Sequence, residues 1–193
     1  MAQTVRQAWV ALRVLLVMTV LVGIVYPLAV FVVGRVVPST ADGSFVTDAS
    51  GTVVGSALIG QSFDGSEWFW PRPSAAGDGY DGLASGGSNL AADNPDLVSA
   101  VAERQSAAAA ADGVAPAEVP ADAVTASGSG LDPDISPEYA QQQVTRVAAA
   151  RGLDVATVES LVADHTQGRA LGFVGEPRVN VLELNLALSQ LTP

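Results

Sequence analysis

Two glycine-rich segments are the residues best suited to binding an anion, because each precedes the start of a predicted helix. The first, Ser85 to Asn94, opens with Ser85, Gly86, Gly87, Ser88 and Asn89, and the second runs from Thr125 to Ser136. Backbone N–H groups in such segments can hold a phosphate or the backbone of a partner protein. The chain has no lysine, so neither segment is a Walker loop. An ordered surface loop is the alternative interpretation.

Asp132, Asp134 and His165 are further candidates for chemistry. The two aspartates either bind a cation or act as turn and helix-cap carboxylates. His165 continues the apolar face formed by Val158 and Val162, so we expect a core-edge histidine bonded to a carbonyl. With one histidine and no cysteine there is no His/Cys zinc site, and no Ser–His–Asp triad is defined. We therefore expect no catalytic residue and no metal site.

Gln143 and an aromatic cluster could contact a ligand or a partner. Gln143 lies at the border of the buried face of a predicted helix, where its amide either satisfies backbone groups or binds a ligand. Trp68, Phe69 and Trp70 meet a proline-rich stretch that forbids helix and central strand. We interpret the cluster as a core plug or a docking surface.

The charge distribution excludes one class of partner. All twenty acidic residues follow Arg35 and only six arginines accompany them, which gives residues 36–193 a formal charge of −14 with His165 neutral. Such a field repels phosphate backbones, so we expect no nucleic acid partner. The domain has no cysteine and therefore no disulfide, so its stability must come from side-chain packing. Its length suits one domain.

The pattern of apolar and turn residues predicts an α+β fold, with a short hairpin and several helices in one acidic extracytoplasmic domain. The hairpin lies within Ser44 to Phe63. Three helices are expected from their caps, at Pro95 to about Ala111, Pro137 to Arg151, and from Asp154 onward. Val179 to Leu191 fits both strand and helix, and we favour helix because Asn180 can cap it.

Val14 to Val33 is a run of twenty residues without a formal charge. A helix of that length spans about 30 Å, the thickness of a bilayer core. We therefore expect a short N-terminal tail over residues 1–13, one transmembrane helix over residues 14–35, and a soluble domain over residues 36–193. A cleaved signal peptide is the alternative, but its apolar run would be shorter and would end in a small-residue site.

Within the span, Thr19 and Gly23 lie four residues apart on one face. Small residues at that spacing allow another membrane helix to approach, although the composition alone would also permit them. Pro27 removes one helical hydrogen bond, so we expect a bend near Gly23.

The basic residues around the span predict its orientation. Arg6 and Arg13 precede it, and only Arg35 follows it closely. By the positive-inside rule the N-terminus lies in the cytoplasm and the domain faces outward from the cell membrane.

Four motifs in chain order, together with the single span, resemble the KdpC family. They are Ser85 to Leu90 with Asn94-Pro95, Val124 to Pro137, His165 to Arg169, and Leu171 to Asn185. That family is the small subunit of the Kdp potassium-transporting P-type ATPase. The resemblance implies a non-catalytic subunit beside a channel-like potassium-binding subunit and an ATP-hydrolysing P-type subunit, in contact with membrane lipid.

The resemblance also implies a role for Gln143. The family has been assigned a chaperone-like enhancement of ATP binding by the catalytic subunit, and Gln143 stands where a glutamine is implicated, while Thr145 stands where proline is usual. By the same resemblance, the subunit would hold no tightly bound cofactor. It would contact ATP only in complex with the catalytic subunit.

An outward domain cannot reach cytoplasmic ATP across the hydrocarbon core, so this role conflicts with the predicted orientation. Either the charge rule misleads, or the nucleotide effect is indirect and the domain caps the potassium-binding subunit near its entrance. We favour the second interpretation. The alternative, from a different functional class, is a membrane-tethered extracytoplasmic sensor or solute-binding module.

Overall fold

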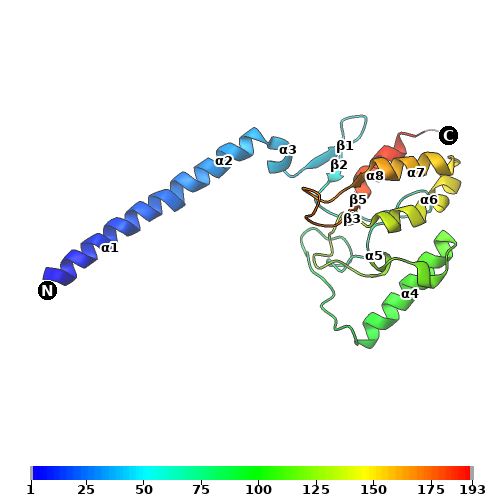
Figure 1. Ribbon diagram of the computed structural model, residues 1–193, viewed down its shortest axis with the longest axis horizontal. Coiled ribbons are helices and arrows are strands. Elements are labelled where there is room, and N and C mark those ends of the chain that lie inside the picture. The colour runs from blue at the N-terminus through cyan, green and yellow to red at the C-terminus, as the bar shows by residue number, and fades with distance from the viewer. Residues whose placement is uncertain (1, 192–193) are drawn as a thin grey trace. The chain divides into compact units, whose positions relative to one another are not determined.

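The computed structural model describes residues 2–191, which divide between Ser44 and Phe45 into two units (Figure 1). The first unit is helical from its start, with α1 at Ala2–Val20, a π-helical turn η1 at Leu21–Val25, α2 at Tyr26–Val36 and the short α3 at Pro38–Ala41. The stretch Ala2–Val36 is long and apolar enough to cross a membrane. Residues 2–13 of the expected N-terminal tail therefore belong to the same helix.

The π-helical turn lies where we expected the helix to be disturbed. Pro27 has no N–H to offer the Gly23 carbonyl, and the Tyr26 N–H bonds to the Leu21 carbonyl instead of the usual acceptor one residue later. Turns of this kind appear where the hydrogen-bond ladder of an α-helix is interrupted. Gly23 lies inside the turn, and the Thr19 hydroxyl donates to the Leu15 carbonyl at 2.8 Å.

The second unit begins with the predicted hairpin, β1 at Phe45–Thr47 paired antiparallel with β2 at Val53–Ser56. Its turn is built on Asp48, whose carboxylate accepts from the backbone N–H groups of Ser50 at 2.8 Å and Thr52 at 2.9 Å. The Ser50 hydroxyl also donates to this carboxylate, and these bonds together lower the pKa of Asp48. The aspartate therefore serves the turn.

A second, three-stranded antiparallel sheet was not predicted. It consists of β3 at Asp134–Ile135, β4 at Thr166–Gln167 and β5 at Arg178–Asn180, in the order β3-β5-β4. Strands of two or three residues are too short to show an alternating pattern. The segment that we had read as helix from Val179 onward is thus a strand up to Asn180, and α8 occupies Val181–Ser189. Asn180 caps α8 as expected, accepting from the Glu183 N–H.

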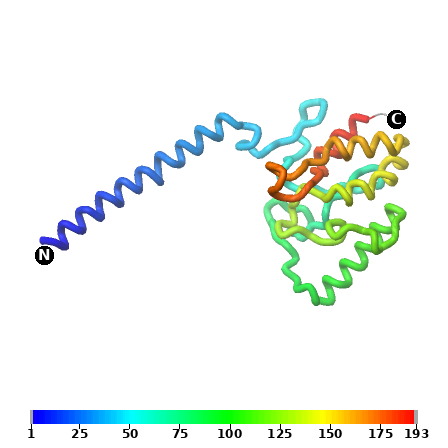
Figure 2. Tube along the Cα trace, in the orientation of Figure 1, coloured from blue at the N-terminus to red at the C-terminus, as the bar shows by residue number. Residues whose placement is uncertain are grey.

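The remaining elements are α4 at Pro95–Asp112, a 3₁₀ turn η2 at Pro116–Glu118, α5 at Ala121–Val124, α6 at Pro137–Arg151 and α7 at Val155–Asp164. α6 packs against both α4 and α7 and lies between them along the trace (Figure 2). Its predicted caps are confirmed, because Ser136 accepts from the Tyr139 N–H at 3.0 Å and Gly152 is left-handed.

The core surrounds α6. Its buried apolar residues come from five helices, the strands β3 and β5 and the aromatic segment, and include Phe69, Ala108, Val124, Ile135, Val144, Val147, Val158, Val162, Val179, Leu184 and Leu188. Burying side chains of this size stabilises the fold by about 1.5–3 kcal/mol each. The aromatic cluster enters this core without being part of a helix or strand.

Candidate functional site

The aromatic cluster is held by two side-chain amides from different helices. In α8, the Asn185 carbonyl oxygen accepts from the Phe69 N–H and its amide nitrogen donates to the Phe69 carbonyl, both at 2.9 Å. In α6, Gln143 does the same for Trp70, accepting from its N–H at 2.6 Å and donating to its carbonyl at 3.2 Å. Each amide replaces the strand that would otherwise satisfy this extended backbone.

Arg146 completes this clamp from one turn further along α6. Its guanidinium donates to the carbonyls of Ser66 at 2.8 Å and Trp68 at 2.9 Å, and to the Gln143 side-chain oxygen at 2.6 Å. Its Nε pairs with the Asp112 carboxylate at 2.8 Å, and both side chains are buried. We call Gln143, Arg146, Asp112 and Asn185 the backbone clamp.

Stacking adds to the hydrogen bonds. The guanidinium carbon of Arg146 lies 3.9 Å from the centre of the Trp70 ring, and that of Arg151 lies 4.3 Å from the Trp68 ring. Such contacts contribute about 0.5–2 kcal/mol, more where they are desolvated. Phe69 is fully buried, while Trp68 and Trp70 are partly exposed at the edge of the core. The cluster is therefore built into the core.

Gln143 is completely buried, and both of its polar side-chain atoms bond within the domain. The sequence allowed the Gln143 amide either to satisfy backbone groups or to bind a ligand. In the structure it satisfies the backbone of Trp70. A ligand that bound the Gln143 amide would have to break its two hydrogen bonds to the Trp70 backbone. Leaving a buried polar group unpaired costs about 1–3 kcal/mol, which opposes such binding.

The two glycine-rich segments lie against each other. The Gly86 N–H donates to the Ser129 carbonyl at 2.8 Å, and the Ser85 hydroxyl donates to the same oxygen at 3.0 Å. Gly130 has a positive φ of 67°, and a Cβ there would lie 2.5 Å from the Gly86 carbonyl oxygen. The close approach of the two backbones therefore accounts for Gly130 and also for Gly87, whose Cβ would lie 3.2 Å from the Gly128 carbonyl oxygen. A Cβ at Gly86 would meet nothing within 4 Å, and Ser88 and Asn89 are exposed.

Arg72 and Tyr80 fasten these segments to the domain. The Arg72 guanidinium pairs with Asp132 at 3.1 Å, and the Tyr80 hydroxyl donates to the Arg72 carbonyl. Burial, with a smaller contribution from the Asp64 charge, raises the pKa of Tyr80 to about 12. Asp132 thus takes part in an ion pair and in the turn before β3, where its carboxylate accepts from the Asp134 N–H.

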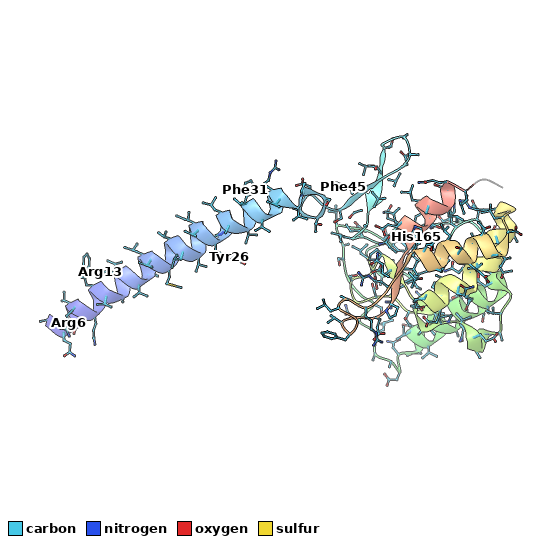
Figure 3. All side chains as sticks on the ribbon, turned by 45° about the horizontal axis from the view of Figure 1, so that its top comes forward. Arg6, Arg13, Tyr26, Phe31, Phe45 and His165 are labelled. Atoms are coloured by element: carbon cyan, nitrogen blue, oxygen red, sulfur yellow. The ribbon has the colours of Figure 1, made fainter. Side chains whose placement is uncertain are left out.

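Asp134 and His165 also have structural partners. Asp134 pairs with Arg178 at 3.0 Å across the sheet, and desolvation raises its pKa although the arginine opposes the shift. His165, labelled in Figure 3, is partly buried with its Nδ1 2.8 Å from the Leu161 carbonyl, which confirms the expected core-edge position. Among residues 2–191 no group of three His, Asp or Glu side chains is placed to hold a metal ion.

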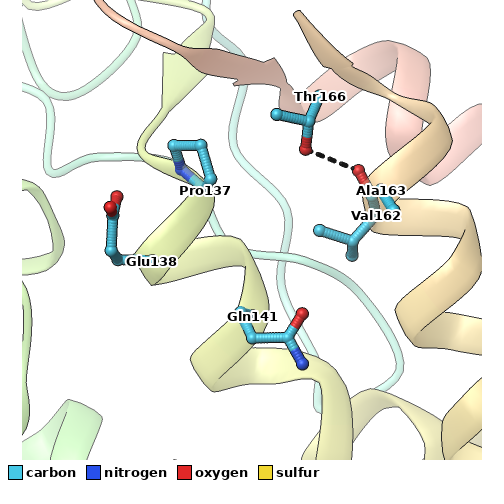
Figure 4. A pocket seen from close by; sticks show the side chains of 6 residues that line it. All are labelled: Pro137, Glu138, Gln141, Val162, Ala163 and Thr166. Carbon is cyan, nitrogen blue, oxygen red and sulfur yellow. Dashed lines mark hydrogen bonds between the residues drawn. The ribbon is translucent and has the colours of Figure 1, made fainter.

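Several grooves open on the second unit. One, of about 570 Å³, lies between the start of α6 and the end of α7, and its polar lining is Glu138 and Gln141 (Figure 4). The Thr166 hydroxyl closes one side of it by donating to the Val162 carbonyl at 2.7 Å. Another, of about 280 Å³, lies between the hairpin and α8 and is lined mainly by apolar groups that include Trp68, together with Asn185 of the backbone clamp. A third, of about 330 Å³, is lined by Pro133 and Asp134 of the second glycine-rich segment and by Asn180. Gln143 lines none of these three grooves.

Sequence reasoning missed Asn185, Arg146 and Asp112. Asn185 does carry a signal, since it lies between Leu184 and Leu186 in an apolar helix and a polar group on a buried face needs a partner. Asp112 was visible only as the end of α4. Its pairing with Arg146 depends on how α4 and α6 pack, which no spacing in the sequence reveals.

An apolar helix long enough to cross a membrane, followed by a separate α+β domain, is the architecture of a membrane-anchored protein. The chain belongs to the KdpC family: residues 8–190 match the family described as K+-transporting ATPase, c chain.

Its relatives include proteins named potassium-transporting ATPase KdpC subunit. That of Kineococcus radiotolerans is 64% identical over 188 residues, covering 97% of this chain and 95% of the relative. That of Beijerinckia indica is 52% identical over 194 residues (100% and 96%), and that of Geobacter sulfurreducens is 50% identical over 185 residues (95% and 97%).

Proposed function

We propose that the chain is the non-catalytic subunit of an ATP-driven, high-affinity potassium import complex. The observation that carries this proposal is the family match over residues 8–190, which includes both the apolar helix and the domain. Its partners would be a channel-like potassium-binding subunit and an ATP-hydrolysing P-type subunit. Thr19 and Gly23 remain our candidates for contact with a partner helix inside the membrane.

In this proposal the domain faces outward and stabilises the potassium-binding subunit near its entrance. The orientation rests on Arg6 and Arg13, which precede the span. The formal charge of −14 on residues 36–193 would draw cations toward the outer face of the complex and hold polyanions away.

Any effect of this subunit on nucleotide affinity is then indirect. The burial of Gln143 and its two bonds to Trp70 support this view, because the side chain is occupied inside the domain. The acidic charge and the lack of lysine also argue against direct binding of a polyanion. Gln143 would act by keeping the domain in the shape that its partners recognise.

Asn185 offers a matched control, because it clamps Phe69 in the way that Gln143 clamps Trp70. We expect Gln143→Ala and Asn185→Ala to lower the melting temperature and the yield of purified complex to similar extents. In the complex that does assemble, both should leave the ATP concentration for half-maximal hydrolysis unchanged. A rise in that concentration for Gln143→Ala alone would restore the direct nucleotide role.

Purification also separates this proposal from a tethered sensor or solute-binding module. A transport subunit isolated in mild detergent should bring two larger membrane proteins with it. A chain that is isolated alone from cells with intact membranes would favour the sensor.

A further inference from the structure

The turn after β4 presents apolar side chains to solvent. Ala170 and Val174 bond to each other through both backbone pairs at 2.9 Å, which leaves Leu171, Gly172 and Phe173 as the tip. Leu171 is 86% exposed, Phe173 is 73% exposed and Val174 is 50% exposed. The three side chains therefore contribute little to the core, and we call residues 169–176 the apolar turn.

The backbone of the apolar turn directs these side chains outward. Leu171 has a φ of +55°, in the left-handed region that residues other than glycine rarely adopt. The exposed Leu171 side chain gains too little inside the domain to explain this conformation. Strain of this kind is a reason to look for a function at the tip.

The charges around the tip differ from those of the rest of the domain. Residues 165–178 hold Arg169, Arg178 and Glu176, a formal charge of +1 with His165 neutral, within a domain of −14. Arg169 and Glu176 pair across the base of the turn at 2.7 Å. Arg178 is paired with Asp134 at 3.0 Å, so the stretch is close to neutral and anionic lipid would repel it less than the rest of the acidic surface.

The chain itself keeps the second unit near a membrane. Eight residues, 37–44, separate the end of α2 from Phe45, so Phe45 stays within about 30 Å of Val36 even if they are fully extended. Within the second unit, Phe45 and the segment that contains the apolar turn lie at the same end along the horizontal direction (Figures 1 and 3). The chain therefore enters the second unit at the end where the apolar turn lies.

We propose that the apolar turn inserts Leu171 and Phe173 into the boundary between headgroups and acyl chains of the membrane that holds the apolar helix. A lipid surface suits the tip better than a protein surface does. Specific protein interfaces bury about 1,200 Å² or more, beyond the reach of three side chains, whereas a few apolar groups suffice for interfacial anchoring when a tether already holds them near the lipid.

The test uses the full chain in phosphatidylcholine nanodiscs without other subunits. Because the chain has no cysteine, Phe173→Cys gives a single site for the environment-sensitive fluorophore NBD. A spin label placed near the lipid headgroups should quench this fluorophore several-fold more than one at Thr157→Cys, an exposed position in α7. Equal, weak quenching at both positions would overturn the proposal.

A second substitution separates insertion from mere proximity. Leu171→Ser in the Phe173→Cys background should reduce the quenching at least by half. Val155 is another exposed apolar residue, 42% accessible to solvent, and Val155→Ser should leave the quenching unchanged. If the fluorophore at residue 173 is shielded only after the potassium-binding subunit is added, the turn contacts that protein and the lipid proposal fails.

Discussion

The pairing of Arg146 with Asp112 is a buried ion pair whose arginine also satisfies three oxygens of the core. Removing one partner of such a pair leaves the other charge without compensation, at a cost of about 3–5 kcal/mol. The pair Arg169–Glu176 has the same chemistry but is exposed, with side-chain accessibilities of 47% and 81%. Exposed pairs contribute about 0–1 kcal/mol.

We therefore expect Arg146→Ala to lower the free energy of unfolding by about 3–5 kcal/mol. Arg169→Ala, its control, should lower it by less than about 1 kcal/mol. Urea titration of the full chain in a mild detergent measures both. Similar values for the two variants would mean that the backbone clamp contributes little to stability.

Tyr80 gives a pH dependence with a defined sign. Its pKa is raised to about 12 in the folded domain, against an ordinary value of 10. Between these values the folded chain keeps a proton that the unfolded chain has lost, so stability should fall as the pH rises from about 10 to 12. Urea titrations at pH 9 and pH 11 should show a smaller loss of stability for Tyr80→Phe than for the unchanged chain. An identical loss would place the titrating group elsewhere.

At the scale of elements, the two glycine-rich segments contact each other through residues 85–87 and 127–130, which belong to no strand or helix. Gly130→Ala places a Cβ against the Gly86 carbonyl and requires a left-handed alanine. We expect a loss of about 2–3 kcal/mol and faster proteolysis around residues 77–91. Gly128→Ala, two residues earlier in the same segment, has nothing within 4 Å of its Cβ and should be nearly neutral. Two equally sensitive glycines would contradict this explanation.

The helices of the domain were predictable because their boundaries are encoded locally. Asn94 with Pro95, and Ser136 with Pro137, are caps whose chemistry acts within one turn. The hairpin was predictable for the same reason, but the strand pairings of the second sheet were not, since β5 pairs with β3 and with β4 through only two residue pairs each. In the candidate site, Gln143 could be singled out from the sequence because it lies on the buried face of a helix. Its pairing with Trp70 could not, because the two residues are 73 positions apart.

At the scale of the whole molecule, the orientation in the membrane is the property on which the proposed function depends. Ser99→Cys, exposed on α4, would give the chain one thiol. If the domain faces outward, this thiol should react in intact cells with a reagent that cannot cross membranes. A cysteine at Gln3, near the N-terminal end of the helix, should then react only after lysis. The reverse pattern would place the domain in the cytoplasm and reopen direct contact with ATP.

The bond from Phe69 to Asn185 also bears on how the protein is made. It joins residues 116 positions apart, and Asn185 lies close to the end of the chain. At a synthesis rate of about 5–20 residues per second, the aromatic segment would wait roughly 6 to 23 seconds after its own synthesis before this partner exists. During that time its rings would be open to chaperones, to proteases and to other nascent chains. A chain released before residue 185 would lack both Asn185 and the buried Leu188 of α8, and so could not complete this part of the core.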